Sequence, residues 1–240
     1  MFTSIYDYRD FYAKPSGKVI QRILSDKILE CWPECNGLSF LGYGYAAPYI
    51  SLYDDKTAQA MLTMPAALGA HHWPEHEPGR VCLAEDSELP FETNSIDRIL
   101  IVHGLERTEI VASALGEIWR VLKSNGRIIM IVPNRLGLWS KAEWTPFGHG
   151  RPYSEMQLTS MLKEALFVPE KRSESLFMPP LKSRLVMKSA RFFEAFGQYV
   201  YPILGGVLVI EASKQLYAPS SGTKAPARLV VRSRAAAMEN

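Results

Sequence analysis

Two glycines follow a short apolar run, and their spacing is the first feature of the sequence that could serve a ligand. Residues 38–41 are apolar and bounded by turn residues, which favours a buried parallel strand. Gly42, Gly44 and Ala46 follow it as G-Y-G-Y-A, and Pro48 suits the first turn of a helix. Small residues at such a junction let a ligand approach the backbone, and a helix N-terminus attracts negative charge. A tight turn without a ligand uses the same residues, so the glycines alone leave both interpretations open.

Acidic and imidazole side chains follow in two later segments. The run E-D-S-E-L-P-F begins with Glu85 and Asp86 and continues to Leu89, and His103 lies at the end of a second apolar run. An imidazole can accept a proton near neutral pH, which is the chemistry of a general base. The alternatives are a solvated acidic turn and a histidine that packs against the backbone.

A third segment, T-P-F-G-H-G-R-P-Y-S over residues 145–154, holds His149, Arg151 and Tyr153. A guanidinium binds a carboxylate or a phosphate with two parallel hydrogen bonds, and His149 and Tyr153 could orient an acceptor hydroxyl. The alternative is a rigid loop in which these side chains have structural roles.

Strands that alternate with helices must position these residues. An amphipathic helix is expected over residues 16–32 with Ser16 as its N-cap, and another over 109–123, ending at the S-N-G of residues 124–126. A third helix is expected over 154–166. Further strands are expected over residues 58–64, 80–84, 96–102, 127–132, 173–178 and 206–213. This alternation predicts parallel βαβ units with right-handed crossovers.

Length and composition set the limits. The chain has 240 residues, 47% hydrophobic and 22% charged, with a net charge of +2, so nucleic acid is not expected as a partner. We expect one domain over residues 1–217, with a helical region at 1–35, an elaboration on the substrate side at about 136–205, and a flexible basic tail at 218–240. Three cysteines and a charged N-terminus favour a cytoplasmic protein without a disulfide framework. Neither a metal site nor a transmembrane segment is expected, and the oligomeric state is left open.

The order of these motifs resembles the class I S-adenosylmethionine-dependent methyltransferases, especially the type 11 group. The resemblance extends over residues 38–167. It rests on G-Y-G-Y-A, E-D-S-E-L-P-F, N-S-I-D-R-I-L-I-V-H-G-L-E, and E-I-W-R-V-L-K-S-N-G before the fifth strand. It implies an α/β, Rossmann-like fold with a mostly parallel seven-stranded sheet in the order 3-2-1-4-5-7-6. Asp97 matches a position that supports the sheet.

The resemblance also implies a cofactor and the residues that would hold it. S-adenosylmethionine would lie at the carboxyl ends of the strands. The implied cofactor-binding positions are Gly42, Gly44, Ala46, Met64, Glu85, Asp86, Leu89 and His103. His103, His149 and Tyr153 are the candidate catalytic residues, and His149, Arg151 and Tyr153 are the candidate substrate residues.

Two departures from the family pattern concern carboxylates. The first strand has Phe40, and the second strand ends in Met64, where the family usually has acidic residues that bind the cofactor. Each lost charge-assisted hydrogen bond is worth about 1.5–3 kcal/mol. The leading prediction is a methyltransferase for a small-molecule or lipid-like acceptor, and the alternative is a non-catalytic binding or regulatory protein with this fold. The N/D-P-P-Y/F motif of nucleic-acid methyltransferases is absent from the sequence.

One basic and aromatic segment, residues 181–201, falls outside these motifs. It combines four basic residues with two aromatic ones, namely Lys182, Arg184, Lys188, Arg191, Phe192 and Phe193. Such a segment could contact anionic lipid or an acidic partner. The alternative is a solvated face over the cavity.

Overall fold

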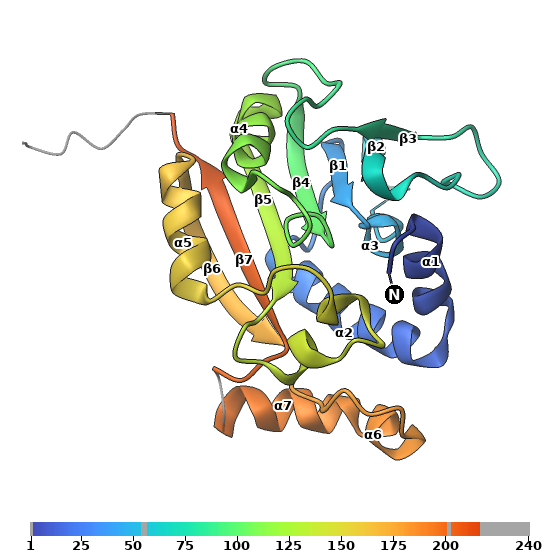
Figure 1. Ribbon diagram of the computed structural model, residues 1–240. Coiled ribbons are helices and arrows are strands. Elements are labelled where there is room, and N and C mark those ends of the chain that lie inside the picture. The colour runs from blue at the N-terminus through green and yellow to red at the C-terminus, as the bar shows by residue number, and fades with distance from the viewer. Residues whose placement is uncertain (1, 54–56, 201–202, 217–240) are drawn as a thin grey trace, which may run out of the picture.

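The computed structural model describes residues 2–53, 57–200 and 203–216, and within them the chain forms a seven-stranded sheet. The strand order is β3-β2-β1-β4-β5-β7-β6, as predicted (Figure 1). The strands are β1 (Ser39–Gly44), β2 (Gln59–Pro65), β3 (Val81–Ala84), β4 (Ile96–Val102), β5 (Leu122–Pro133), β6 (Phe167–Ser175) and β7 (Val207–Lys214). Strands β1 to β5 are parallel, whereas β7 runs antiparallel to both of its neighbours.

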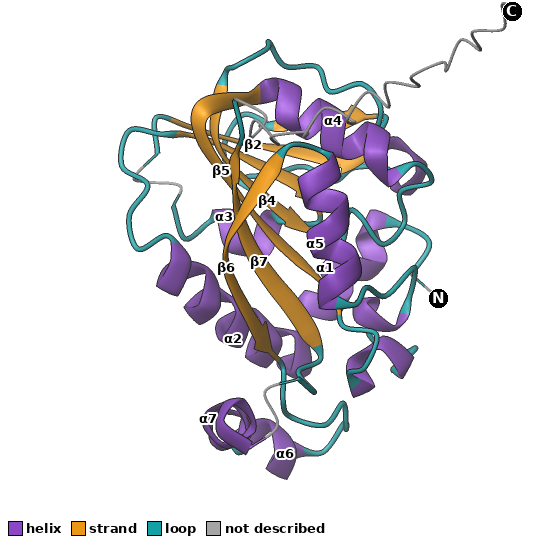
Figure 2. Ribbon diagram, turned by 90° about the vertical axis from the view of Figure 1, so that its left-hand side faces the viewer, coloured by secondary structure: helices purple, strands orange, loops and turns teal. Residues whose placement is uncertain are grey.

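Helices cover both faces of the sheet (Figure 2). The α-helices are α1 (Ile5–Ala13), α2 (Pro15–Cys31), α3 (Ala47–Ile50), α4 (Val111–Val121), α5 (Glu155–Glu164), α6 (Arg184–Lys188) and α7 (Ala190–Val200). Three 3₁₀ turns, η1 (Ala66–Leu68), η2 (Leu138–Lys141) and η3 (Pro146–Gly148), complete the elements. One hydrophobic core includes residues of α1, α2 and α3, and a second core on the opposite face includes residues of α4 and α5.

Alternation along β1 assigns its side chains to these two cores. Phe40 belongs to the core under α2, whereas Leu41 and Tyr43 belong to the core under α4. Successive strand residues point to opposite faces of a sheet. The turn after β1 therefore lies between the two cores.

Several expected boundaries were wrong. Helix α2 begins at Pro15 rather than with Ser16 as its cap, because proline at the first helical position needs no hydrogen-bond partner for its nitrogen. Helix α4 ends at Val121, and β5 begins at once because buried Leu122 already pairs with Ile96 of β4. Strand β6 occupies 167–175 instead of 173–178, along the outer side of β7.

Asp97 has the supporting role expected of it. Its carboxylate accepts the Ser39 N–H at 3.0 Å and pairs with the Lys123 ammonium at 2.7 Å. It therefore ties the start of β1 to β4 and to the start of β5.

The region expected to be helical at residues 1–35 contains two helices. Helix α1 precedes α2, and the basic aromatic segment folds into α6 and α7. No helix in the described part of the chain is long and apolar enough to cross a membrane. The tail expected at 218–240 lies outside the described residues.

Candidate functional site

The turn after β1 packs directly against the end of β4. Gly44 has a φ of +82°, and a Cβ there would collide with the backbone of Val102 and Gly104. The N–H of Tyr45 donates to the Val102 carbonyl at 2.7 Å. A Cβ on Gly42 would collide with core side chains. Glycine is therefore needed at both positions for close packing within the protein.

Helix α3 is a single turn of four residues with Pro48 in its first turn. The expectation that a helix N-terminus here faces negative charge is weakened, because a helix this short has only a small aligned dipole. Among the described residues between β1 and β2, helical structure is limited to this one turn.

Helix α1 places aromatic side chains over this turn. Ser4 caps the helix, and the Asp7 carboxylate accepts the N–H groups of Thr3 and Ser4, which lowers the pKa of Asp7. Ile5, Tyr8 and Tyr12 recur at helical spacing and are buried. The helix therefore docks through one face.

A compact aromatic cluster fills the space between the β1 turn, β4 and the loop after β5. It consists of Tyr8, Tyr12, Tyr45, Tyr49, His103 and Phe147, all at most 5% exposed. The Tyr12 and Tyr45 rings stack at 5.7 Å, Tyr8 lies 5.2 Å from the His103 ring, and Phe147 lies 4.7 Å from it. Aromatic rings at these distances have favourable packing geometry. The cluster closes the carboxyl ends of β1 and β4.

A chain of buried hydrogen bonds crosses this cluster. Tyr49 donates to the Tyr12 hydroxyl at 2.9 Å, Tyr12 lies 2.8 Å from His103 Nε2, and His103 Nδ1 lies 3.2 Å from Glu106 Oε1. The chain is complete when the imidazole proton resides on Nδ1, so that Nε2 accepts from Tyr12. His103 is 1% exposed and Glu106 is 2% exposed. Glu106 Oε2 has no hydrogen-bond partner among the described residues.

The tyrosines of the cluster stay protonated at physiological pH. Burial raises the pKa of Tyr8 to about 12 and the pKa of Tyr12 well above its ordinary value. Desolvation disfavours the charged phenolate. Both hydroxyl groups therefore remain available as hydrogen-bond donors.

The acidic turn after β3 forms a separate, open part of the site. Asp86 is held in place by the Tyr43 hydroxyl, which donates to its carboxylate at 2.6 Å. Leu89 is buried, and its N–H donates to the Glu117 carboxylate at 2.9 Å. A cavity of about 260 Å³ adjoins this turn. Its lining residues are Ala67, Glu85, Asp86, Ser87, Arg107, Glu109, Ile110 and Ser113.

The loop of residues 145–154 lies over the end of β4. The Arg151 N–H donates to the Glu106 carbonyl at 2.8 Å, and the Tyr153 hydroxyl donates to the Leu105 carbonyl at 2.9 Å. Tyr153 is buried, and burial raises its pKa to about 12, whereas the Arg151 side chain is exposed. The His149 side chain is half-buried, lies 2.7 Å from the Glu143 carbonyl and contacts Phe2. The structure brings this loop to His103 but gives Tyr153 a structural hydrogen bond.

The two positions without carboxylates are buried in the core. Phe40 stacks on Tyr53 at 5.1 Å and meets Trp32 edge-on at 5.7 Å. Met64 is fully buried in the same core. Neither side chain is exposed to a ligand.

A more apolar cavity of about 320 Å³ lies where the junction of α1 and α2 meets the start of α6. Trp144 lines it, and the Lys182 ammonium lies 5.3 Å from the Trp144 ring. The other lining residues are Phe11, Lys14, Pro15, Ser16 and Met187. Apolar walls with two ammonium groups suit an amphiphile with an anionic group.

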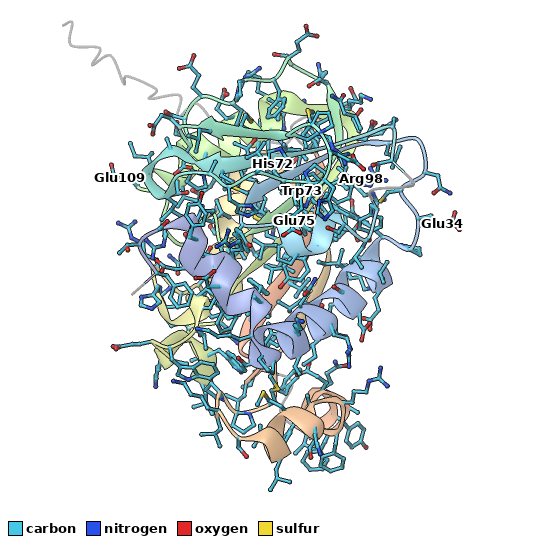
Figure 3. The ribbon with its side chains drawn as sticks, turned by 90° about the vertical axis from the view of Figure 1, so that its right-hand side faces the viewer. Glu34, His72, Trp73, Glu75, Arg98 and Glu109 are labelled. Carbon is cyan, nitrogen blue, oxygen red and sulfur yellow. The ribbon has the colours of Figure 1, made fainter. Side chains whose placement is uncertain are left out.

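The histidine-rich loop between β2 and β3 forms no metal centre with its neighbours. Figure 3 shows His72, Trp73 and Glu75 near the middle of one face, with Glu109 and Glu34 at its opposite edges. Within the described ranges, no three His, Cys, Asp or Glu side chains come close enough together to hold a metal ion.

Sequence reasoning missed Tyr8 and Tyr12 as site residues. The signal was present in the helical spacing of Ile5, Tyr8 and Tyr12. That spacing predicts a buried helix face, although it does not reveal that His103, 91 residues away from Tyr12, is the partner.

Comparison with known proteins agrees with the fold. Residues 42–130 match the family model described as methyltransferase domain, which is less than half of the chain. No curated protein matches the chain.

Three solved structures illustrate the likeness. A SAM-dependent methyltransferase of Thermotoga maritima, described as a possible histamine N-methyltransferase, has a TM-score of 0.61 at 16% identity, covering 90% of this chain and 100% of that one. A SAM-dependent methyltransferase of Archaeoglobus fulgidus has a TM-score of 0.58 at 15% identity, covering 81% and 94%. The 4+2 cyclase SpnF has a TM-score of 0.54 at 19% identity, covering 82% of each chain. At these identities the likeness concerns the fold.

Proposed function

We propose that this protein, which has the class I methyltransferase fold and a methyltransferase domain over residues 42–130, is an S-adenosylmethionine-dependent methyltransferase for a small amphiphilic acceptor. The observation that carries the proposal is a convergence at the carboxyl ends of the strands. The Gly44 turn, the Asp86 cavity and the His103–Glu106 pair all lie at these ends. Ligands of open α/β sheets bind at this position, where the strand order reverses.

The described residues fit one half of the cofactor. Asp86, oriented by Tyr43, and the neighbouring Glu85 offer acceptors for an adenine amino group at the rim of the 260 Å³ cavity. The same turn is anchored by Leu89, which is buried in the core under α4 and donates its N–H to Glu117. This is the adenosine half of the site.

The methionine half does not fit in the conformation described. Tyr12 and Tyr45 stack where the turn after β1 faces the end of β4, and the Tyr45 N–H is already bonded to Val102. Phe40 and Met64 offer no carboxylate. Binding of a whole cofactor therefore requires α1 to withdraw its tyrosines.

His103 is the group that would become available. Once Tyr12 leaves, Nε2 loses its hydrogen bond and faces the opened space, while Glu106 keeps the proton on Nδ1. A neutral imidazole in this tautomer can take a proton from an acceptor hydroxyl or amine. The cofactor, when bound, supplies an electrophilic methyl group, and the chain supplies alignment and exclusion of water.

The acceptor class is proposed from the second cavity. The space between Trp144, Lys182 and Lys14 suits an apolar body with a carboxylate or phosphate. The exposed Arg151 guanidinium is a further anion-binding group on the loop near His103.

Thermal unfolding with S-adenosylmethionine or its demethylated product tests this proposal. A ligand at 100-fold its dissociation constant adds about 2.7 kcal/mol to the free energy of unfolding. We expect the melting temperature to rise, and Asp86→Ala to weaken binding at least tenfold. Glu92→Gln, an exposed acid on the same loop, is the matched control.

A second candidate function is favoured by the Tyr12 and Tyr45 rings, which occupy the space that the methionine part of the cofactor would need. The protein would then be a non-catalytic binding protein that retains this fold. Tyr12→Ala distinguishes the two, because removing the stacked ring should tighten cofactor binding if α1 only gates the site. The enzymatic proposal would be refuted if millimolar cofactor changed the melting temperature of neither the wild type nor a folded Tyr12→Ala variant.

A further inference from the structure

Helices α6 and α7 pack against the core under α1, α2 and α3 through Val186, Ala190 and Phe193, and α7 presents an apolar face outward. Figures 1 and 2 show them at one end of the molecule, beyond the end of the sheet toward which β5 runs. Phe192, Phe196 and Tyr199 recur at helical spacing on α7 and are 66%, 50% and 90% exposed. The Phe192 and Phe196 rings stack on each other at 5.7 Å. We call these three residues the α7 face.

Further exposed apolar side chains flank the α7 face in the sequence. Leu181 and Leu185 precede it, Ile203 and Leu204 follow it, and all four are between 47% and 77% exposed. Single exposed apolar side chains are ordinary on a protein surface, whereas a contiguous group of large ones marks an interaction site.

The inner side of α7 is firmly attached to the protein. The half-buried Glu194 carboxylate accepts the Ser175 hydroxyl at 3.0 Å and the N–H groups of Leu176 and Phe177 at 3.1 and 2.7 Å. Gly197 packs against Phe177 so closely that a Cβ would collide with it. These contacts fix the orientation of α7, so its aromatic residues are held outward.

The exposed charged side chains that flank the α7 face in the sequence are basic. Lys182, Lys188 and Arg191 are exposed beside it. Glu194 is the one acidic residue in the sequence from 181 to 204, and its carboxylate is directed inward. Aromatic residues flanked by cations are typical of helices that lie in the interface of an anionic membrane.

We propose that the α7 face docks this protein on the surface of an anionic lipid bilayer. Phe192, Phe196 and Tyr199 would enter the boundary between headgroups and acyl chains, and Lys188 and Arg191 would meet anionic headgroups. Docking is independent of methyl transfer. It also puts the Lys182 cavity, which adjoins α6, close to the lipid.

Vesicle flotation of the full chain tests docking. The probes are vesicles of phosphatidylcholine alone and vesicles that also contain phosphatidylglycerol. We expect at least tenfold tighter binding to the anionic vesicles, and weaker binding at higher salt. Each basic residue near such a surface contributes about fivefold. Lys188→Glu with Arg191→Glu should therefore weaken binding by about 25-fold or more.

The triple variant Phe192→Ser, Phe196→Ser and Tyr199→Ser should weaken binding at least tenfold. Its matched control is Met156→Ser with Leu83→Ser, since these side chains are 84% and 52% exposed on other elements. Circular dichroism and the melting temperature verify that each variant is folded.

Two outcomes would overturn the proposal. The first is a triple variant that is folded and binds like the wild type, because binding then comes from elsewhere, such as the basic residues after position 217. The second is a wild-type protein that does not bind anionic vesicles and is a dimer, together with a triple variant that is a monomer. The α7 face is then a contact between copies of the chain.

Discussion

Replacing Tyr12 with phenylalanine removes one oxygen atom from the centre of the buried hydrogen-bond chain. The ring remains, so stacking on Tyr45 is kept. The Tyr49 hydroxyl loses its acceptor and His103 Nε2 loses its partner. A buried polar group left without a partner costs about 1–3 kcal/mol. Two such groups, partly relieved by rearrangement, should cost about 2–4 kcal/mol.

Tyr49→Phe serves as the comparison for Tyr12→Phe, because it removes only the outer hydrogen bond of the chain. It removes a donor to Tyr12 but leaves Tyr12 bonded to His103, so we expect it to cost only about 1 kcal/mol. Tyr6→Phe on the exposed side of the same helix should cost less than about 0.5 kcal/mol.

Urea and thermal unfolding followed by circular dichroism measure these differences. In a domain of this size, 1 kcal/mol shifts the melting temperature by about 2–4 °C. Tyr12→Phe should therefore lower it by roughly 4–16 °C, and clearly more than Tyr49→Phe. Equal effects of the two variants, or a Tyr12→Phe effect as small as that of Tyr6→Phe, would refute a connected chain through His103.

Three further predictions concern the surroundings of the site. Phe40→Asp introduces the missing carboxylate, but the charge would be buried in an apolar core. We therefore expect it to lower the free energy of unfolding in urea by more than about 4 kcal/mol and to create no cofactor binding. A stable variant with improved cofactor affinity would contradict this. Asp7→Ala removes the carboxylate that completes the capping box of α1, so it should speed amide hydrogen exchange in α1 while exchange in α2 is unchanged. The lowered pKa of Asp7 means that the ionised carboxylate stabilises the helix, so protonation of Asp7 at low pH should have the same effect. Exchange in α1 as slow as in the wild type would contradict this. Burial raises the pKa of Glu174 to about 7, so its contribution to stability is present below its unfolded pKa and is lost as pH rises through 7. Between pH 5 and 8 the wild type should lose stability relative to Glu174→Gln but not relative to exposed Glu170→Gln in urea titrations, and parallel profiles would disprove the role of Glu174.

The strand order could be predicted from the sequence, because each apolar run and each turn motif stood in the order of a known family. Ile96–Val102 was placed to the residue as β4. The start of β5 was missed because K-S-N-G has the composition of a turn, whereas pairing of buried Leu122 with Ile96 draws the strand back by five residues. Tertiary pairing decided that boundary.

The candidate site was harder to predict for a different physical reason. Its parts lie in separate segments whose contacts depend on docking. Tyr153 carries a hydroxyl that could serve catalysis, yet in the fold it donates to the Leu105 carbonyl. The helix containing Tyr12 shows its apolar spacing in the sequence, but only the three-dimensional structure brings Tyr12 to His103. Residue type gave the chemistry, and packing decided which groups are free to perform it.

The two departures from the family pattern, Phe40 and Met64, lie in the core on one face of the sheet. Phe40, Tyr45 and Met64 belong to the core under α1, α2 and α3, whereas Tyr43 and Leu89 belong to the core under α4. Since neighbouring residues of β1 point to opposite faces, the first face can become apolar without disturbing the second. The polar contacts of Asp86 and of Leu89 with their partners persist on the second face. Phe40 packs between the rings of Trp32 and Tyr53, where a buried carboxylate would lack a partner. Any ligand that binds here must therefore either displace α1 or engage the α4 side alone.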